Sequence, residues 1–227
     1  MIASRDNERL KLVRKLHDRR WRDKLGLFFV EGEDAVAAAT ASPVDLLRAG
    51  VDVEPKLLAD VASVPHPPRV IGVYRRADLP VWEERAATLA LWQLADPGNL
   101  GTLIRAADAF GAAVVLSPGC ADPTSPKALR ASAGSIWRVP LGSWESASNS
   151  LVPAKRVALV AHGGEPLASV DLSGRVMFLL GAEREGLPVE VERDVDATIP
   201  IAGAESLNVA VTGAIALYER ARQHENA

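Results

Sequence analysis

Residues 175–188, RVMFLLGAEREGLP, decide the fold of this 227-residue chain. The run VMFLL has the length of a strand and is apolar on both faces, which is typical of a buried parallel sheet. Gly181 and Gly186 follow it, and glycine lets a backbone approach a bound molecule closely. Glu183 stands between them with a carboxylate that can accept hydrogen bonds. The stretch predicts a buried strand that ends in a ligand-binding loop.

Strand-like and helix-like segments alternate on both sides of this stretch. The other apolar runs are TLALWQL (88–94), AAVVLS (112–117), RVALVAH (156–162) and DATIPI (196–201). The helical patterns are LGTLIRAADAFG (100–111), SPKALRASAG (125–134), VEVERDV (189–195) and a final helix over residues 206–224. Alternating elements with nearly continuous apolar strands predict an α/β fold with a parallel sheet covered on both faces.

The first third of the chain predicts a separate, smaller α/β unit. Apolar side chains at helical spacing predict one amphipathic helix over residues 6–24, and LGLFFVEG, DLLRAG and RVIGVY read as short strands. Charged residues and a proline without a clear period follow Tyr74. We therefore predict a domain over residues 1–75, a linker over 76–87 and a second domain over 88–227.

Composition excludes several classes of protein. With 48% hydrophobic and 24% charged residues the chain is typical of globular proteins. A single cysteine, Cys120, excludes an internal disulfide, and without a Cys/His cluster we expect no metal site. The charged N-terminus and the lack of a run of about 20 apolar residues predict neither a signal peptide nor a membrane span. We expect a soluble, cytoplasmic protein.

Charge is distributed unevenly, although the net charge is only −3. Residues 1–25 hold nine Lys or Arg against four Asp or Glu. Such an asymmetry is expected of a surface that contacts phosphates, while the alternative is a solvated helix face. Arg14, Arg19 and Arg22 are the candidate contacts.

Two further loops follow predicted strands and carry polar residues. In DPGNLGTLIR (96–105), Asn99 can cap a helix, and Arg105 lies in an apolar pattern where a guanidinium needs a partner or a ligand. In IPIAGAESLN (199–208), a cap would explain Ser206 but not Asn208. Because ligands bind beyond the carboxyl ends of parallel strands, these loops and the glycine loop are where chemistry is expected.

The three segments, in this order, resemble the three motifs of SpoU-type (TrmH-like) RNA ribose methyltransferases of the SPOUT superfamily. The segment KALRASAGSIWRVP (127–140) also resembles that family, and the resemblance covers about residues 88–222. The N-terminal stretches ASRDNERLKLVRKL (3–16) and RWRDKLGLFFVEGEDAV (20–36) are similar to the L30e-like RNA-substrate-binding domain that often precedes this catalytic domain. Together they make an RNA contact by the N-terminal basic residues a stronger hypothesis.

The resemblance implies methyl transfer from S-adenosylmethionine to a ribose 2′-hydroxyl in RNA, without a metal. It suggests ribosomal RNA as a substrate in preference to transfer RNA. It further implies a C-terminal trefoil knot and a homodimer, since the knot region supplies the usual interface.

Site residues follow from the resemblance position by position. The reaction site would hold Asn99, Arg105, Glu183, Ser206 and Asn208. The cofactor would contact Gly181, Gly186, Ile199, Ile201 and Leu207. We expect Arg105 to hold the target phosphate and to stabilise the developing alkoxide, with Asn99 and Glu183 fixing its guanidinium. The chain departs from the family in one place, because the loop between Gly203 and Ser206 is one residue shorter.

Two alternatives come from other classes of protein. A parallel sheet is also typical of nicotinamide-dependent oxidoreductases, but the sequence has no G-x-G-x-x-G fingerprint and no ribose-binding acid after it. The other alternative is an RNA-binding relative that has lost catalysis. Retention of all five polar motif residues argues against that loss.

Overall fold

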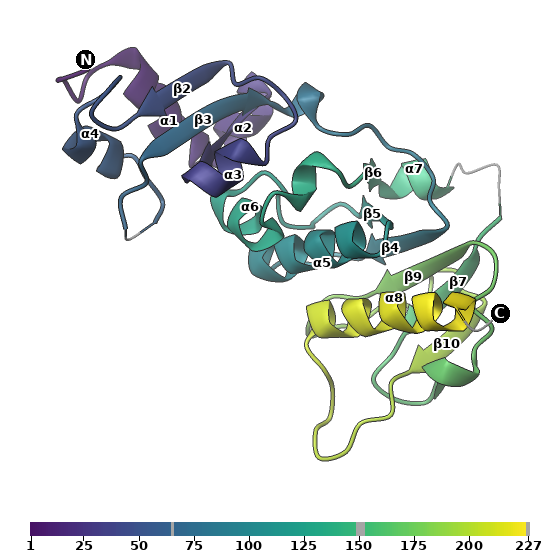
Figure 1. Cartoon of the computed structure of the whole chain (residues 1–227). Helices are drawn as coiled ribbons and strands as arrows, with labels where there is room; N and C mark the ends of the chain where they lie inside the picture. Colours follow the sequence, from purple (N-terminus) through teal and green to yellow (C-terminus); the bar gives the residue numbers. More distant parts are fainter. Residues whose placement is uncertain (65, 149–152, 226–227) are drawn as a thin grey trace.

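The protein contains two sheets of different construction (Figure 1). The computed structural model describes residues 1–64, 66–148 and 153–225. A three-stranded antiparallel sheet lies near the N-terminus, and a seven-stranded sheet with parallel pairing lies in the rest of the chain. The predicted α/β class with a parallel sheet is confirmed.

The N-terminal unit, residues 1–75, packs helices against the antiparallel sheet. Its elements are α1 (Glu8–Leu16), α2 (Arg19–Leu25), β1 (Leu27–Glu31), α3 (Glu33–Ala37), β2 (Asp45–Arg48), α4 (Pro55–Ala59) and β3 (Val70–Arg75). Leu10, Val13 and Leu16 form the buried stripe of α1, as their spacing predicts. The single helix predicted over residues 6–24 is wrong, because Asp18 turns out of the helical conformation and caps α2.

The C-terminal unit, residues 87–225, contains the parallel sheet, and the short helix η1 (Arg76–Asp78) precedes it. Its elements are β4 (Ala87–Leu91), α5 (Pro97–Ala109), β5 (Ala113–Leu116), α6 (Pro126–Ser132), η2 (Ser135–Trp137), β6 (Leu141–Ser143), α7 (Trp144–Ser148), β7 (Lys155–Leu159), β8 (Glu165–Pro166), η3 (Leu167–Ser169), β9 (Val176–Leu180), β10 (Val195–Thr198) and α8 (Val209–Glu225). The strand order is β6-β5-β4-β9-β7-β10-β8.

Alternating side chains of the central strands enter two different cores. Leu89 and Leu91 of β4 and Phe178 of β9 belong to the core under α5 and α8, which pack against each other on that face (Figure 1). Ala90 and Leu179 point to the opposite face, which Trp82, Trp144 and the loop after β9 partly cover. The central strands are therefore buried on both faces, which explains their nearly continuous apolar sequence.

The helix predicted over VEVERDV (189–195) is wrong. The structure has turns and bends over residues 189–194, and β10 begins at Val195. The segment alternates apolar and acidic residues, a period of two that does not make an apolar helix stripe. Val191 instead packs on the second face of the sheet. The trefoil knot and the L30e-like identity of the N-terminal unit stay predictions, as do the domain boundaries.

The two units share a buried interface. Phe28 and Tyr74 of the N-terminal sheet contact Trp137 of η2, with ring centroids 5.6 and 4.9 Å apart. Beside these rings, Asp122 accepts a hydrogen bond of 2.8 Å from Nε of Arg22 and one of 2.6 Å from Arg76. The side chains of Arg22 and Asp122 are only 4% and 5% exposed, so each charge depends on the other.

We predict that Asp122→Asn lowers the free energy of unfolding by about 3–5 kcal/mol, because it leaves the buried Arg22 without its counter-charge. Chemical denaturation measures this. Asp34→Asn is the matched control, since Asp34 is exposed and should change stability by less than about 0.5 kcal/mol. Equal stability of the two variants would contradict the account of the interface.

The ion pair of Arg22 and Asp122 also makes the stability of the protein depend on pH. Burial raises the pKa of Asp122, but hydrogen bonds from Thr124 and Arg22 outweigh it, so the pKa lies below the ordinary value. A lowered pKa contributes stability that is complete above the unfolded-state pKa and is lost as pH falls through the folded-state pKa. The stability gap between wild type and Asp122→Asn should therefore narrow below about pH 4. Denaturation curves at successive pH values test this, and a constant gap would refute it.

Candidate active site

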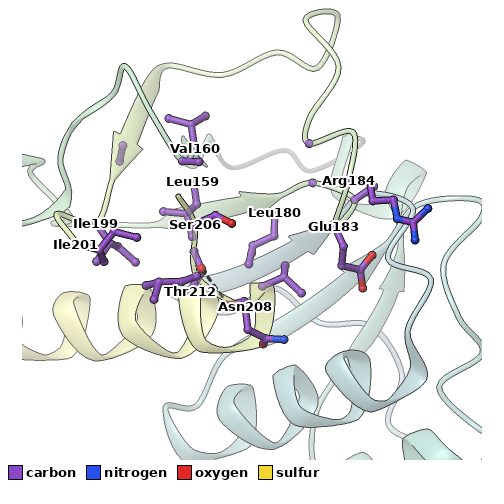
Figure 2. Close-up of a pocket in the computed structure, with 17 residues that line it drawn as sticks. Leu159, Val160, Leu180, Glu183, Arg184, Ile199, Ile201, Ser206, Asn208 and Thr212 are labelled. Atoms are coloured by element: carbon purple, nitrogen blue, oxygen red, sulfur yellow. Dashed lines mark hydrogen bonds between the residues drawn. The ribbon is translucent and has the colours of Figure 1, made fainter. Parts of the chain in front are cut away.

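Loops from three parallel strands meet around one cavity (Figure 2). The carboxyl ends of β7, β9 and β10 lie at the same edge of the sheet, because the strands run parallel and are neighbours. The cavity between their loops has a volume of about 520 Å³, within the range of about 300–1,000 Å³ typical of small-molecule sites. All five residues predicted to contact a cofactor line it: Gly181, Gly186, Ile199, Ile201 and Leu207.

Backbone geometry explains why glycine follows β9. A Cβ added to Gly181 would lie 2.1 Å from the carbonyl carbon of Gly186, so this position has no room for a side chain. Ala182 and Gly186 exchange backbone hydrogen bonds of 3.1 and 3.0 Å, and Gly186 takes a φ of +69°. The loop is thus folded back on itself, with Glu183 at its tip.

Asn99 joins the other two motif loops through its side-chain amide. Its Nδ2 donates to Oε1 of Glu183 at 3.1 Å, and its Oδ1 accepts from Nδ2 of Asn208 at 3.0 Å. Glu183 and Asn208 also line the cavity. The side chain of Asn208 lies on the α8 side in Figure 2 and that of Glu183 on the β9 side. The sequence predicts that these three residues share a site, and the structure brings them together.

Two expected helix caps are wrong. Asp96, and not Asn99, caps α5, since its carboxylate accepts the backbone N–H of Asn99 at 2.9 Å. A hydrogen bond from Lys127 is the main reason that the pKa of Asp96 is lowered. At α8 the cap is Asn208, whose Oδ1 accepts from the backbone of Ala210 at 2.9 Å. Asn99 and Asn208 therefore lie at helix starts with side chains turned toward the site.

Ser206 is exposed and lies on the loop that precedes α8. It lines the cavity but makes no hydrogen bond within the described part of the chain. The side chain is thus available to a ligand and has no capping role.

Arg105 is exposed on α5 and, within the residues that the structure describes, has no hydrogen bond or ion pair. This excludes the alternative that it neutralises a buried carboxylate. The expectation that Asn99 and Glu183 fix its guanidinium is also not met, because these two side chains bond to each other. Its charge is free to meet an anion from outside the chain.

The structure adds cavity residues that the sequence analysis did not select. Leu159, Val160 and Ala161 come from the end of β7 and the loop after it, and the other added lining residues are Leu180, Ala182, Arg184, Ala197, Val209 and Thr212. The run RVALVAH contained the first three, and its place in a parallel sheet was the signal that could have identified them. Arg184 follows Glu183 directly, but no rule of spacing distinguishes it from a surface cation.

The predicted RNA contacts of the N-terminal helix divide into two kinds. Arg22 is wrong as an RNA contact, because its guanidinium is buried on Asp122 and on the carbonyl oxygens of Leu16 and His17. Arg14 and Arg19 remain accessible, although each donates to a backbone carbonyl. Spacing alone did not reveal which face of α2 is buried.

The described residues contain neither a group of metal ligands nor a membrane-spanning helix. Among residues 1–64, 66–148 and 153–225, no three His, Cys, Asp or Glu side chains are grouped as metal ligands. No helix of that described part is long and apolar enough to span a membrane.

Comparisons with known proteins identify the family of this chain. Residues 86–218 match the model of the SpoU rRNA Methylase family. The chain is 31% identical to the 23S rRNA (guanosine(2553)-2′-O)-methyltransferase RlmP of Bacillus subtilis, over 96% of this chain and 97% of that protein.

Solved structures are similar over the whole length. An AdoMet-bound rRNA methyltransferase from Sinorhizobium meliloti superposes with a TM-score of 0.86 at 30% identity, covering 98% of this chain and 97% of the other. The SpoU methyltransferase AviRb from Streptomyces viridochromogenes, also with AdoMet, gives 0.84 at 27% identity, covering 97% and 99%. This chain therefore belongs to the SpoU rRNA methylase family.

Proposed function

We propose that the chain transfers the methyl group of S-adenosylmethionine to a ribose 2′-hydroxyl in RNA, and that ribosomal RNA is the substrate. The observation that carries this proposal is the row of hydrogen-bonded side chains Glu183, Asn99 and Asn208 beside the cavity. The names of the relatives support both the donor and the acceptor, since they include an AdoMet-bound rRNA methyltransferase and a 23S rRNA 2′-O-methyltransferase.

The cavity fits a cofactor that is part purine and part amino acid. Leu159, Ile199 and Ile201 form apolar walls suited to an adenine ring, while Glu183 and Ser206 supply polar groups. Residues 201–207 take part in none of the backbone hydrogen bonds of the described chain, so their backbone N–H and C=O groups can form hydrogen bonds with the cofactor. When bound, S-adenosylmethionine supplies an electrophilic methyl group on a sulfonium.

The chain's own residues then have to position the ribose and stabilise charge. The Asn99 amide holds Glu183 and Asn208 in a fixed relation, which preorganises the reaction site. We assign to Arg105 the target phosphate and the developing negative charge on the 2′-oxygen. An arginine stays protonated in proteins, which suits an electrostatic role and not that of a base. Ser206 is free to contact the nucleotide or the cofactor.

The same proposal includes the assembly and the place of action. We expect a cytoplasmic homodimer, a trefoil knot around α8, and an L30e-like N-terminal unit that contributes RNA affinity. Val211 and Tyr218 on α8 are 47% and 58% exposed, an apolar surface that a second copy would cover. An RNA-binding relative that has lost catalysis is the remaining alternative, and it predicts RNA binding without methyl transfer.

Arg105→Ala should remain folded and bind S-adenosylmethionine, but lose at least about 10²-fold in single-turnover methylation of RNA. The side chain is exposed and unpaired within the described chain, so its removal strands no charge. Arg105→Lys should not restore the rate, because an ammonium lacks the planar guanidinium. Arg69→Ala, at an arginine whose side chain is 85% exposed in the N-terminal unit, is the control. Near-normal turnover of a folded Arg105→Ala protein would rule out this role.

Gly181→Ala should abolish binding of S-adenosylmethionine measured by calorimetry, since the new methyl group displaces the loop at Gly186. Gly111→Ala serves as a control, because that glycine has a positive φ but open space around it, far from the cavity. If both variants bind S-adenosylmethionine equally well, the cofactor does not bind against the loop that contains Gly181.

Light scattering should give twice the mass of one chain at micromolar concentration. Tyr218→Glu should shift the protein toward the monomer, because it places a charge on the exposed apolar surface of α8. A monomeric wild type would refute the proposed homodimer but not the proposed methyl transfer.

A further inference from the structure

Two lysine ammonium groups lie over the indole ring of Trp21 in α2. Nζ of Lys15 is 5.2 Å from the centre of the indole and Nζ of Lys24 is 5.0 Å from it. The indole is half-buried while both lysines are exposed. A cation over an aromatic face at an exposed site is held only weakly, so another ligand can replace it.

The lysines at Trp21 are not tied up in ion pairs within the described part of the protein, although Glu8 lies close enough to Lys15 to interact with it electrostatically. Within those residues, the side chains of Lys15, Arg20 and Lys24 make no ion pair. The other charged side chains near α2 form ion pairs. Asp23 pairs with Arg19 and Arg76, and Asp122 pairs with Arg22. Two cations without an ion pair in the described chain, Lys15 and Lys24, thus lie over one half-buried aromatic ring.

The position of α2 connects this patch with the reaction site. Arg19 donates to the carbonyl oxygen of Cys120 at 3.1 Å, in the loop that follows β5. Ala121 of that loop donates to the carbonyl oxygen of Leu94, in the loop between β4 and α5. Because β4 and β5 are parallel, α2 lies at the same edge of the sheet as Asn99. Figure 1 shows α2 on the side of the N-terminal unit that faces the larger sheet.

We infer that Trp21, Lys15 and Lys24 form a binding site for an unpaired base of single-stranded RNA. The indole stacks on the base, and the two ammonium groups move to the adjoining phosphates. Every base offers a face for stacking, whereas a duplex keeps its bases covered. The inference rests on the proposed function in one respect, namely that the substrate is RNA. It adds a recognition element outside the cavity and outside the three motifs.

The test compares two short RNA probes of equal length by fluorescence anisotropy, one of adenosine only and one abasic strand with the same phosphates. Trp21→Leu keeps an apolar side chain on α2 but removes the aromatic ring. It should weaken binding of the adenosine strand by about tenfold and leave the abasic strand unchanged. Trp21→Phe should restore most of the affinity. A thermal melt of each variant confirms that α2 is intact.

The lysines are tested through the salt dependence. Replacing Lys15 and Lys24 with Gln should reduce the slope of log affinity against log salt by about 0.7 for each phosphate that the protein no longer neutralises, with both probes. The matched control is Lys56→Gln with Arg69→Gln, two exposed cations of the same unit, away from α2. An equal reduction in both double variants would mean nonspecific attraction and overturn the site.

Failure of this inference can be separated from failure of the proposed function. If wild type methylates RNA while Trp21→Leu binds both probes as wild type does, only the stacking site is refuted. If Trp21→Leu weakens the abasic strand as much as the adenosine strand, stacking is again refuted. If wild type binds neither probe and transfers no methyl group to RNA, the proposed function fails as well.

Discussion

The parallel pairing of β4, β9, β7 and β10 is the constraint on which the site depends. Strands that run in one direction end at one edge, so the loops after them must share the space beyond that edge. The return helices α5 and α8 then lie together on one face, and their first residues come back to the same place. Loops from three distant parts of the sequence therefore meet beyond these strand ends, because the direction of the strands alone brings them together.

Beside the cavity the side chains of Glu183, Asn99 and Asn208 form one hydrogen-bonded group, whereas Arg105 lies on α5 and is not among the residues that line the cavity. Asn99 is held by Glu183 and Asn208, and backbone bonds between Ala182 and Gly186 fix the loop that carries Glu183. Arg105 has no partner within the described chain. A rigid pocket suits a small cofactor, whereas an unpaired guanidinium suits a large anionic substrate that arrives from solution. The proposed function assigns the cavity to the cofactor and Arg105 to the RNA on this basis.

The sequence predicted the parallel sheet and the shared location of Asn99, Glu183 and Asn208, because apolar period and glycine placement are local properties. It failed where two local explanations compete. Asp96 and Asn99 both suit a helix start, and the aspartate becomes the cap because Pro97 takes the first helical position after it. Arg22 reads as a surface cation, and Asp122, a hundred residues away, makes it a buried one. Such a pairing depends on how the two units pack together, and the spacing of apolar residues within one segment does not predict that.

The most direct measurement is the chemical position of the transferred methyl group. Ribosomal RNA and transfer RNA from cells that lack this protein would be incubated with the purified protein and isotopically labelled S-adenosylmethionine, then digested to nucleosides and analysed by mass spectrometry. The account predicts label in a single 2′-O-methylnucleoside from ribosomal RNA, with the adjoining phosphodiester resistant to alkali. Label on a base, label confined to transfer RNA, or no incorporation by a protein that binds the cofactor would contradict it.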